Sequence, residues 1–407
     1  MQDRPSKHDK STNEEEQSRK QASRERKHRQ YTMDDGQANQ TTSNEQKPQR
    51  QTTNDKGLNP KQQAPTPILI LNWNGLDDTL ECMDSLLKQS HQDFIIYLAD
   101  NGSTGDDQKI LQEKFGESPK IKLRFFDENH GFTKAHNILF EEVLQGDVPY
   151  LITLNNDTIQ ESDWLEKLLA FAERQQADMI SCKMINYFDR SKMDNAGHRM
   201  LNTAEIIPYA SGESVNKWNK PFENLGPCAG AALYSTEMLR KIGTFDPFFE
   251  TGYEDAELGL RACILGYKAW YCPDAVVYHK VSASINKVMD YDYKLKIQKS
   301  IFYTWFKLMP KGLIGMTKFS FYFKYGMVFL IDIILRRKIF YQVMKDAFAW
   351  KKGAGAKQIK AARDAFYTQH KPISSFKIRK RLQFFLFFDI SRFWKFVVLK
   401  EKSFFER

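Results

Sequence analysis

The chain has 407 residues, of which 41% are hydrophobic and 27% charged, and its formal net charge is +9. This length exceeds one average domain and allows a sizeable buried core. The five cysteines include no CxxC pair and no zinc-ligand spacing, and no apolar segment near the N-terminus fits a signal peptide. We therefore expect a reduced, cytosolic protein without a zinc-finger site.

The charge is distributed unevenly along the chain. The first 66 residues carry a net charge of +3, residues 67–300 carry −11 and residues 301–407 carry +17. An acidic central part is thus joined to a strongly basic C-terminal third. We expect three regions, a tail, a folded domain and a helical extension, at 1–64, 65–300 and 301–407.

The N-terminal segment, residues 1–64, is rich in Gln, Asn, Ser, Lys and Glu and nearly free of aliphatic side chains. Such a segment cannot bury enough apolar surface to offset the entropy of ordering, so we predict a disordered polar tail. The basic run at 23–29 leaves a nucleic-acid-binding arm as the alternative. The low net charge and the single aromatic residue, Tyr31, argue against nucleic acid as a partner.

From residue 65 onwards, apolar strands alternate with amphipathic helices. The predicted strands lie at 68–74, 93–103, 121–132 and 148–157, and the predicted helices lie at 76–90, 135–145 and 162–175. This alternation indicates an α/β fold with a mostly parallel sheet, helices on both faces and right-handed crossovers. Residues 176–225 are irregular, with short possible strands. The remaining predicted elements are a turn or strand and a helix within 226–243, a helix at 257–267 and strands at 268–280.

The C-terminal region, residues 301–407, is basic and aromatic. Its apolar segment at 319–335 is interrupted by Lys324 and Asp332, so the uninterrupted part is shorter than the roughly 20 residues that span a bilayer. A second aromatic segment at 381–400 directly follows a basic run. Such segments suit helices that lie on an anionic membrane surface. The alternatives are a solvated helical bundle or oligomer contact and a true membrane span.

Polar residues follow the first two predicted strands. The first strand ends in Asn72 and Asn74, and the second in Asp100, Asn101 and Gly102. Ligands of open α/β folds bind at the carboxyl ends of the strands, so these residues would line a nucleotide site. The Asp100 carboxylate can accept a hydrogen bond from a pyrimidine N3–H, and turn amides beside Gly102 can face ribose or phosphate. The alternative is that they are ordinary strand-exit residues.

A glycine-containing turn at 129–137 opens the next predicted helix. Asn129, Gly131 and the turn amides could face phosphate at the helix N-terminus. The segment lacks the GxGxxG spacing of a dinucleotide site and the Gly-Lys-Ser/Thr of a P-loop. These absences argue against a dehydrogenase or a kinase.

The fourth predicted strand ends in Asn155, Asn156 and Asp157. A single carboxylate at Asp157 can bind a hard divalent ion, since Mg²⁺ commonly takes one or two carboxylates together with substrate phosphates and water. Asn156 would lie beside the nucleotide sugar. The alternative for Asp157 is a turn or helix-cap residue. His279, after a later apolar run, is either structural or a ligand of the metal or diphosphate.

A second acidic cluster, Glu254 and Asp255, comes about a hundred residues later, just before a predicted helix. It offers a general base that would deprotonate an acceptor hydroxyl, a role worth roughly a hundred- to ten-thousandfold in rate. Acidic residues also favour first helical turns because of the macrodipole, which is the structural alternative.

These motifs occur in an order that resembles glycosyltransferase family 2, and most closely its rhamnosyltransferase-like bacterial members. The resemblance covers residues 66–285 and is carried by ILNWNG, LADNGST, NHGFTKAHN, LNNDT, GTFDPFFETGYEDAELGLRA and VVYHKVSAS. It implies a GT-A fold, a requirement for Mg²⁺ or Mn²⁺, and inversion at the anomeric carbon. By the same resemblance Asp100 binds the base, Asp157 is the last Asp of the DXD motif, Asp255 is the catalytic base and His279 lies near the diphosphate.

Two residues depart from the family pattern. Asn155 stands where the first carboxylate of DXD is usual, which implies low metal affinity or binding of metal together with nucleotide. Lys134 replaces the small residue usual in the glycine-rich turn and is expected to contact phosphate.

The leading hypothesis is an inverting, metal-dependent glycosyltransferase at the cytoplasmic face of the membrane. Its donor would be a UDP- or dTDP-linked sugar, dTDP-rhamnose included, and its acceptor a cell-surface polysaccharide or lipid-linked glycan. A non-catalytic scaffold with the same fold and a nucleotidyltransferase are the alternatives. The two separate acidic motifs argue against the scaffold, and NWNGLDD after the first strand is not the basic loop of a nucleotidyltransferase.

Overall fold

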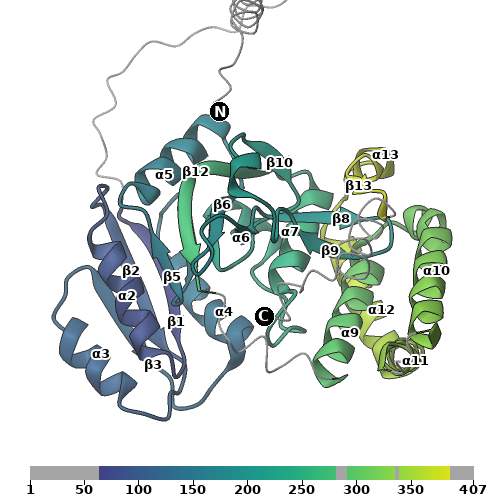
Figure 1. Ribbon diagram of the computed structural model, residues 1–407, viewed down its shortest axis with the longest axis horizontal. Helices are drawn as coiled ribbons and strands as arrows, with labels where there is room; N and C mark the ends of the chain where they lie inside the picture. Colours follow the sequence, from purple (N-terminus) through teal and green to yellow (C-terminus); the bar gives the residue numbers. More distant parts are fainter. Residues whose placement is uncertain (1–63, 281–290, 335–338, 386–407) are drawn as a thin grey trace, which may run out of the picture. The chain divides into compact units, whose positions relative to one another are not determined.

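The computed structural model describes residues 64–280, 291–334 and 339–385 (Figure 1). The predicted tail, except for residue 64, and the segment after residue 385 lie outside these ranges.

A large mixed sheet forms the centre of the folded part. Its main path runs β10-β12-β6-β11-β4-β1-β2-β3, with β5 paired to β12 and β7 to β6. The strands β3, β2, β1 and β4 are parallel to one another, β11 is antiparallel to both of its neighbours, and β6 and β12 are parallel. The strands are β1 (Thr66–Asn72), β2 (Phe94–Asp100), β3 (Ile121–Phe125), β4 (Tyr150–Asn155), β5 (Thr158–Gln160), β6 (Met179–Asn186), β7 (Met193–Asn195), β10 (Phe222–Asn224), β11 (Ala231–Ser235) and β12 (Ala269–His279).

Helices cover both faces of this sheet because successive side chains of a strand point to opposite sides. Ile68 and Ile70 of β1 pack in one cluster with helices α2 (Leu76–Leu87) and α5 (Trp164–Gln175). Leu69 packs in the other with α4 (Gly131–Leu144), α6 (Thr236–Ile242) and α7 (Glu254–Leu265). All three β1 side chains are fully buried, and each such burial is worth about 1.5–3 kcal/mol. The predicted α/β class, with helices on both faces, is confirmed.

Three local expectations need correction. From the sequence we expect only short strands in the region 176–225. The structure instead has β6 there, a strand of eight buried residues in the middle of the sheet. Helix α3 (Asp107–Phe115) was not predicted, because its polar sequence buries only two residues. Helix α7 begins at Glu254, three residues before the predicted start, so Glu254 and Asp255 lie in its first turn.

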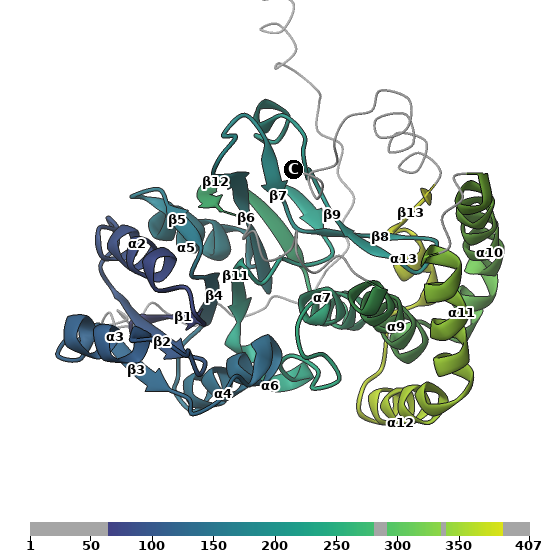
Figure 2. The ribbon, with the colours of Figure 1, turned by 60° about the horizontal axis from the view of Figure 1, so that its bottom comes forward.

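A small second sheet and a group of helices complete the described chain. The sheet has the order β13-β8-β9. Its strands are β8 (His198–Leu201), β9 (Ile206–Pro208) and β13 (Leu382–Gln383), and a 3₁₀ turn, η1, lies at Val215–Lys217. The C-terminal helices, in green to yellow in Figures 1 and 2, are α9 (Tyr291–Leu308), α10 (Lys311–Ile334), α11 (Ile339–Lys352), α12 (Ala354–Gln369) and α13 (Ser375–Arg379). The domain boundary expected at residue 300 falls inside α9.

The C-terminal helices pack on α7 through a shared apolar core and a buried ionic network. Phe302 and Trp305 of α9 lie in one cluster with Leu260 of α7. Glu257 of α7 is fully buried and pairs with Arg261 (2.7 Å) and with Lys307 of α9 (2.6 Å). Among the described helices, none is both long and apolar enough to cross a membrane.

Candidate functional site

Asn72 and Asp100, at the carboxyl ends of β1 and β2, are fully buried and joined to each other. The Asn72 amide donates to Asp100 Oδ2 (2.7 Å) and to Asp107 (2.8 Å). Asp100 also accepts hydrogen bonds from Ser103, through its hydroxyl and its amide, and from Gln108. Both Asp100 oxygens therefore already have donors, and the carboxylate fixes the shape of the strand exits. Its expected contact with a nucleobase stays a prediction, and a base could bind it only by displacing one of these donors.

Asn74 and Trp73 form the exposed rim of these strand exits. Asn74 adopts a left-handed conformation (φ 50°), and its side-chain oxygen accepts from the backbone amide of Thr104 (2.8 Å), which joins the first exit loop to the second. The Trp73 side chain is 55% exposed at the same edge, although our sequence analysis assigned it no role. An exposed indole beside two polar strand exits offers a flat surface for stacking.

The turn before α4 is fastened to the same edge. The Asn101 amide donates to Asn129 (3.0 Å) and to the carbonyl of Gly131 (3.3 Å), and Asn101 Oδ1 accepts from the amide of His130. Gly102 (φ 72°) permits this approach, because a Cβ there would lie 2.4 Å from the backbone of Glu128. The structure thus brings together the residues predicted from the second strand and the glycine-containing turn.

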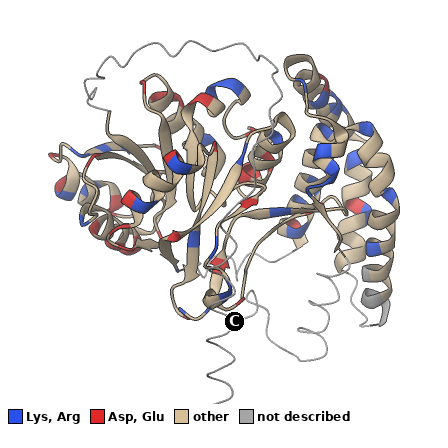
Figure 3. Cartoon of the chain, turned by 90° about the horizontal axis from the view of Figure 1, so that it is seen from above, with Lys and Arg blue, Asp and Glu red and all other residues tan. Residues whose placement is uncertain are grey.

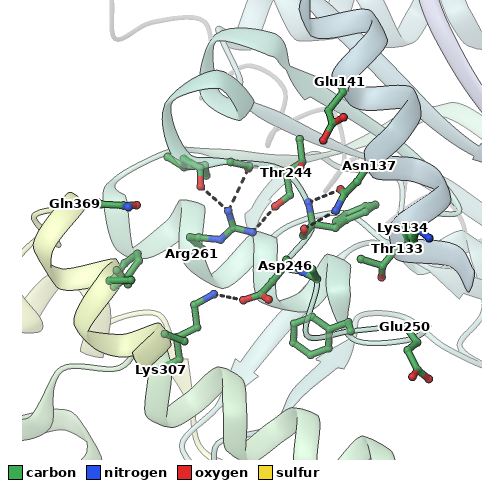
Figure 4. A pocket seen from close by; sticks show the side chains of 18 of the residues that line it. Thr133, Lys134, Asn137, Glu141, Thr244, Asp246, Glu250, Arg261, Lys307 and Gln369 are labelled. Carbon is green, nitrogen blue, oxygen red and sulfur yellow. Dashed lines mark hydrogen bonds and ion pairs between the residues drawn. The ribbon is translucent and has the colours of Figure 1, made fainter. Parts of the chain in front are cut away.

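Lys134 lies in the first turn of α4, beside His130. Its ammonium is 3.4 Å from His130 Nδ1, and its exposed side chain lines a hollow of about 850 Å³ between α4, the loop before α7 and the C-terminal helices (Figure 4). Among the described contacts, Lys134 makes none with Asp100 or Asp157. Its expected phosphate contact therefore stays a prediction without a geometric observation behind it.

The expected metal ligands, Asp157 and His279, lie side by side. Asp157 is buried, and its Oδ1 lies 3.2 Å from His279 Nε2. The other ring nitrogen, Nδ1, lies 2.8 Å from the carboxylate of Asp194 on β7. Burial lowers the pKa of His279, but the charges and hydrogen bonds of Asp157 and Asp194 outweigh it and raise the pKa to about 10. The imidazole is thereby held in one orientation between two carboxylates.

Asp194, which our sequence analysis did not identify, lies beside the predicted site residue His279. It reaches His279 only because β7 and β12 both pair with β6, which places segments 85 residues apart next to each other. No local pattern marks it, since it lies in a short segment of mixed polarity. A metal-binding histidine usually donates its second N–H to a carboxylate in this way, which fixes the ring and its tautomer.

Neither asparagine before Asp157 contacts it in the described hydrogen bonds. The Asn156 amide donates to Thr79 of α2 (2.9 Å). The Asn155 side chain lies against Gly230, where a Cβ would be 3.1 Å from its amide nitrogen. Within the described residues, no group of three or more His, Cys, Asp or Glu side chains is arranged so that it could hold a metal ion, so the protein offers few ligands of its own.

The second acidic motif, Glu254 and Asp255, reaches the same edge. Asp255 Oδ2 accepts from the backbone amide of Ala229 (3.0 Å), just before β11, which pairs with β4. This approach needs small residues, because α7 packs so closely on the loop before β11 that a Cβ on Gly226 would lie 2.8 Å from Gly259. The two acidic motifs, about a hundred residues apart in the sequence, thus meet at the end of one sheet.

The pKa of the Cys228 thiol reflects its burial and three nearby carboxylates. Burial raises its thiol pKa well above the usual value, and so do the charges of Asp255, Asp194 and Glu254. Carboxylates from β7 and from α7 therefore act on one side chain between them. Burial and then the charge of Asp255 raise the pKa of Glu254 to about 8.

Two observations set the start of α7 apart. Glu254 Oε2 is buried without a hydrogen-bond partner among the described residues. Tyr253, immediately before it, has φ 82°, a left-handed conformation that costs a non-glycine residue about 1–2 kcal/mol. The Tyr253 hydroxyl accepts from the amide of Ile206, which holds the strained residue in place. Strained backbone of this kind tends to be kept where function needs it.

Comparison with known proteins identifies the domain. Residues 68–243 match the model of glycosyl transferase family 2. This part of the chain is therefore a glycosyl transferase family 2 domain, and the resemblance drawn from the motifs is confirmed. Glu254, Asp255 and His279 lie beyond the matched residues, so their roles stay predictions.

Two relatives agree with this assignment. The O-antigen biosynthesis protein RfbC of Myxococcus xanthus is 25% identical over 271 residues, 62% of this chain and 20% of that protein. The dTDP-rhamnosyl transferase RfbF of Shigella flexneri is 21% identical over 183 residues, 44% of this chain and 58% of that protein. The chain therefore spans less than two thirds of either relative.

A solved structure supports the GT-A fold. The crystal structure of GalNAc-T7 with UDP, GalNAc and Mn²⁺ superposes with a TM-score of 0.50 at 14% sequence identity, covering 64% of this chain and 50% of that one. At this identity the likeness concerns the fold alone.

Proposed function

We propose that the protein is an inverting, metal-dependent glycosyltransferase that moves a sugar from a nucleotide-sugar donor to a hydroxyl group of a surface polysaccharide or lipid-linked glycan. The observation that carries the proposal is the meeting of two acidic sites at one sheet edge. Asp157 and His279 lie on one side, and on the other Asp255 accepts a hydrogen bond from the backbone amide of Ala229, in the loop just before β11. A site for the departing diphosphate and a base for the acceptor are both needed for this reaction.

The side chains at Asp157 and His279 suit a divalent ion. They place a carboxylate oxygen and a histidine nitrogen 3.2 Å apart, with the ring already fixed by Asp194. Because the pKa of His279 is raised to about 10 without metal, its Nε2 proton would have to leave when an ion binds. Two protein ligands fit an ion that takes its remaining ligands from substrate phosphates and water, as Mg²⁺ does. When bound, Mg²⁺ or Mn²⁺ would stabilise the negative charge that develops on the departing diphosphate. Asp157 and His279 would hold the ion, and Asp194 would keep His279 in the metal-binding orientation.

Asp255 acts as the general base in this proposal. The acceptor hydroxyl oxygen forms a bond to the anomeric carbon while the bond from that carbon to the diphosphate oxygen breaks. The hydroxyl proton passes to the Asp255 carboxylate, and attack opposite the leaving group inverts the anomeric configuration. Backbone amides of Ala229 and Ala256 donate to Asp255 and hold it in one orientation.

Glu254 supports this arrangement by remaining protonated near neutral pH. Its pKa of about 8 follows from burial and from the neighbouring charge of Asp255. A neutral Glu254 adds no second negative charge beside Asp255, and adjacent carboxylates rarely carry charge together.

The donor half of the site would be the strand-exit edge. Asn72, Asp100 and Asn101 shape it, and the exposed Trp73 offers a stacking surface for the base. A UDP- or dTDP-linked donor is favoured, dTDP-rhamnose included, because one relative is named a dTDP-rhamnosyl transferase.

We also propose that the chain works at an anionic membrane surface through residues 301–407. Their net charge of +17 supports this, and lipid-linked acceptors are found at such surfaces.

The test of the activity is donor hydrolysis by the purified chain. UDP-, dTDP- and GDP-sugars are incubated with Mn²⁺ or Mg²⁺, and the released nucleoside diphosphate is measured with and without chelator. We expect metal-dependent release from one pyrimidine-linked donor. If no donor is hydrolysed and no nucleoside diphosphate binds by calorimetry, the catalytic proposal is wrong and a scaffold role is left.

A further inference from the structure

The outward face of α10 is unusually apolar. Of the thirteen exposed large hydrophobic side chains among the described residues, six lie on this helix. They are Met316, Phe319, Tyr322, Phe323, Phe329 and Leu330, and we call them the α10 stripe. The stripe follows the three- and four-residue spacing of one helix face. Phe319, its most exposed member, is 78% exposed.

The opposite face of α10 is fixed to the rest of the protein. Leu313 and Tyr325 are buried in the core shared with α7 and α9. Lys324 is buried and pairs with Glu205, beside β8 and β9, and Asn202 donates to Ser320 (2.8 Å). If the helix rotated or crossed a bilayer, the buried ion pair between Lys324 and Glu205 would be lost. The helix can therefore offer one face only.

The stripe continues onto neighbouring segments. Ring contacts join Phe319 to Phe323 (6.0 Å), and Phe323 packs against the buried ring of Phe385. Phe329 contacts Tyr341 of α11 (5.4 Å), which is itself 49% exposed. Soluble proteins rarely leave so large a contiguous apolar patch uncovered. In Figures 1 and 2, α10 lies at the edge of the ribbon, away from the large sheet.

The positive charges around the α10 stripe favour an anionic partner. Exposed lysines, Lys311 and Lys318, lie on α10 itself, and Arg336, Arg337 and Lys338 follow the helix in the sequence. Lysine and arginine residues, coloured blue in Figure 3, occur along the C-terminal helices. A second copy of the chain would bring the same positive charge to the contact and be repelled. Aromatic side chains bordered by lysine and arginine match the acyl boundary and phosphate headgroups of an anionic bilayer.

We propose that the α10 stripe is the surface by which the protein lies on an anionic phospholipid bilayer. Aromatic side chains of the stripe enter the headgroup and acyl boundary, and the flanking lysines contact lipid phosphates. The sheet edge with Asp157 and Asp255 stays outside the bilayer, where a nucleotide sugar can reach it. This inference rests on the membrane attachment proposed above and names the residues that make it.

The first test is co-sedimentation of the full chain with vesicles. Wild type is compared with a Phe319→Ser/Phe323→Ser variant, and Phe188→Ser serves as the matched control because Phe188 is 77% exposed outside the helices. We expect wild type and control to bind phosphatidylglycerol-containing vesicles and to be released by high salt. The double variant should partition at least about tenfold more weakly. Donor hydrolysis without vesicles should be equal in all three, which shows that the variant is folded.

The outcomes separate the two proposals. If wild type does not bind anionic vesicles, the membrane attachment itself is wrong, and if it binds phosphatidylcholine alone equally well, the proposed preference for an anionic surface is wrong. If wild type binds but the double variant binds equally, attachment occurs elsewhere and the α10 stripe is wrong as its surface.

A second measurement identifies any other occupant of the stripe. The native cysteines are buried or partly buried, so Phe319→Cys can be labelled with a polarity-sensitive fluorophore. We expect its emission to shift to the blue only when anionic vesicles are added. An apolar signal before addition would overturn the proposal: light scattering would then assign the stripe to a second copy if the protein is dimeric, or to another segment of the same chain if it is monomeric.

Discussion

Helix α7 carries two charged clusters one turn apart, and they differ in how completely the protein satisfies them. In the first, which we call the α7–α9 network, Glu257, Arg261, Lys307 and Asp246 share hydrogen bonds. Arg261 also donates to three carbonyl groups of the loop 242–244 (Figure 4). Every member has an opposite charge beside it, so the network fixes α9 on α7.

The second cluster, Glu254 and Asp255, is left open. Glu254 has a buried oxygen without a partner in the described part of the chain, and its pKa is raised to about 8. No described ion pair joins either carboxylate to a lysine or arginine. The comparison suggests that closed charge networks on this helix hold the fold, whereas the open one is free to exchange a proton with a substrate.

The largest effect is expected from Asp255→Asn. Removing the proposed base should lower the turnover number by roughly a hundred- to ten-thousandfold, because proton transfer from the acceptor is lost. Nucleoside diphosphate binding, measured by calorimetry, should change little. Near-normal turnover of the variant would exclude Asp255 as the base.

The next effect concerns the closed network. Lys307→Met leaves Asp246 without its cation and removes one of the two cations that pair with Glu257, and breaking such a buried pair typically costs about 3–5 kcal/mol. The free energy of unfolding in urea should fall by that order. Lys360→Met is the control, because Lys360 pairs with Asp364 on the surface and such pairs are worth about 1 kcal/mol or less. Equal losses in both variants would show that the α7–α9 network holds the fold no more strongly than a surface ion pair.

A smaller effect is expected from Asp194→Asn. The change removes the charge that orients His279 and should weaken Mn²⁺ binding about 10- to 100-fold. Calorimetric titration with Mn²⁺ in the presence of nucleoside diphosphate measures it. Asp84→Asn, a surface change, is the control. Unaltered affinity in Asp194→Asn would show that His279 is not a ligand or needs no positioning.

The smallest effect concerns pH and stability. Because the pKa of Glu254 rises from 4.5 to about 8 on folding, the folded chain binds more protons than the unfolded chain between those values. This group therefore reduces stability as pH increases from about 4.5 through 8. Glu254→Gln should remove that contribution, so the melting temperature of the variant relative to wild type should be higher at pH 9 than at pH 5. An identical difference at both pH values would show that Glu254 titrates normally.

The elements that sequence analysis predicted well are those with a local signal. Strands β1 and β4 are short apolar runs ending in polar residues, and the motifs after them fixed the expected edge of the sheet. The meeting of the two acidic motifs could also be predicted, because both follow the same family pattern.

The missed features depend on tertiary pairing. Asp194 lies beside His279 only because β7 and β12 both pair with β6. The sequence of β6, which includes Cys182 and Lys183, shows no clear alternation of apolar and polar residues. The direction in which the α10 stripe faces is equally invisible in the sequence, because apolar residues occur on both sides of that helix. Only the packing of Leu313 and Lys324 decides which side is outward.

The most direct test of the central claim is calorimetric titration of UDP and dTDP into the wild type, Asp157→Asn and Asp255→Asn chains, with and without Mn²⁺. We predict metal-dependent binding of at least one nucleotide to wild type and to Asp255→Asn, and its loss in Asp157→Asn. Binding that ignores the metal, or that is lost in Asp255→Asn and kept in Asp157→Asn, would contradict the division of the sheet edge into a diphosphate side and an acceptor side.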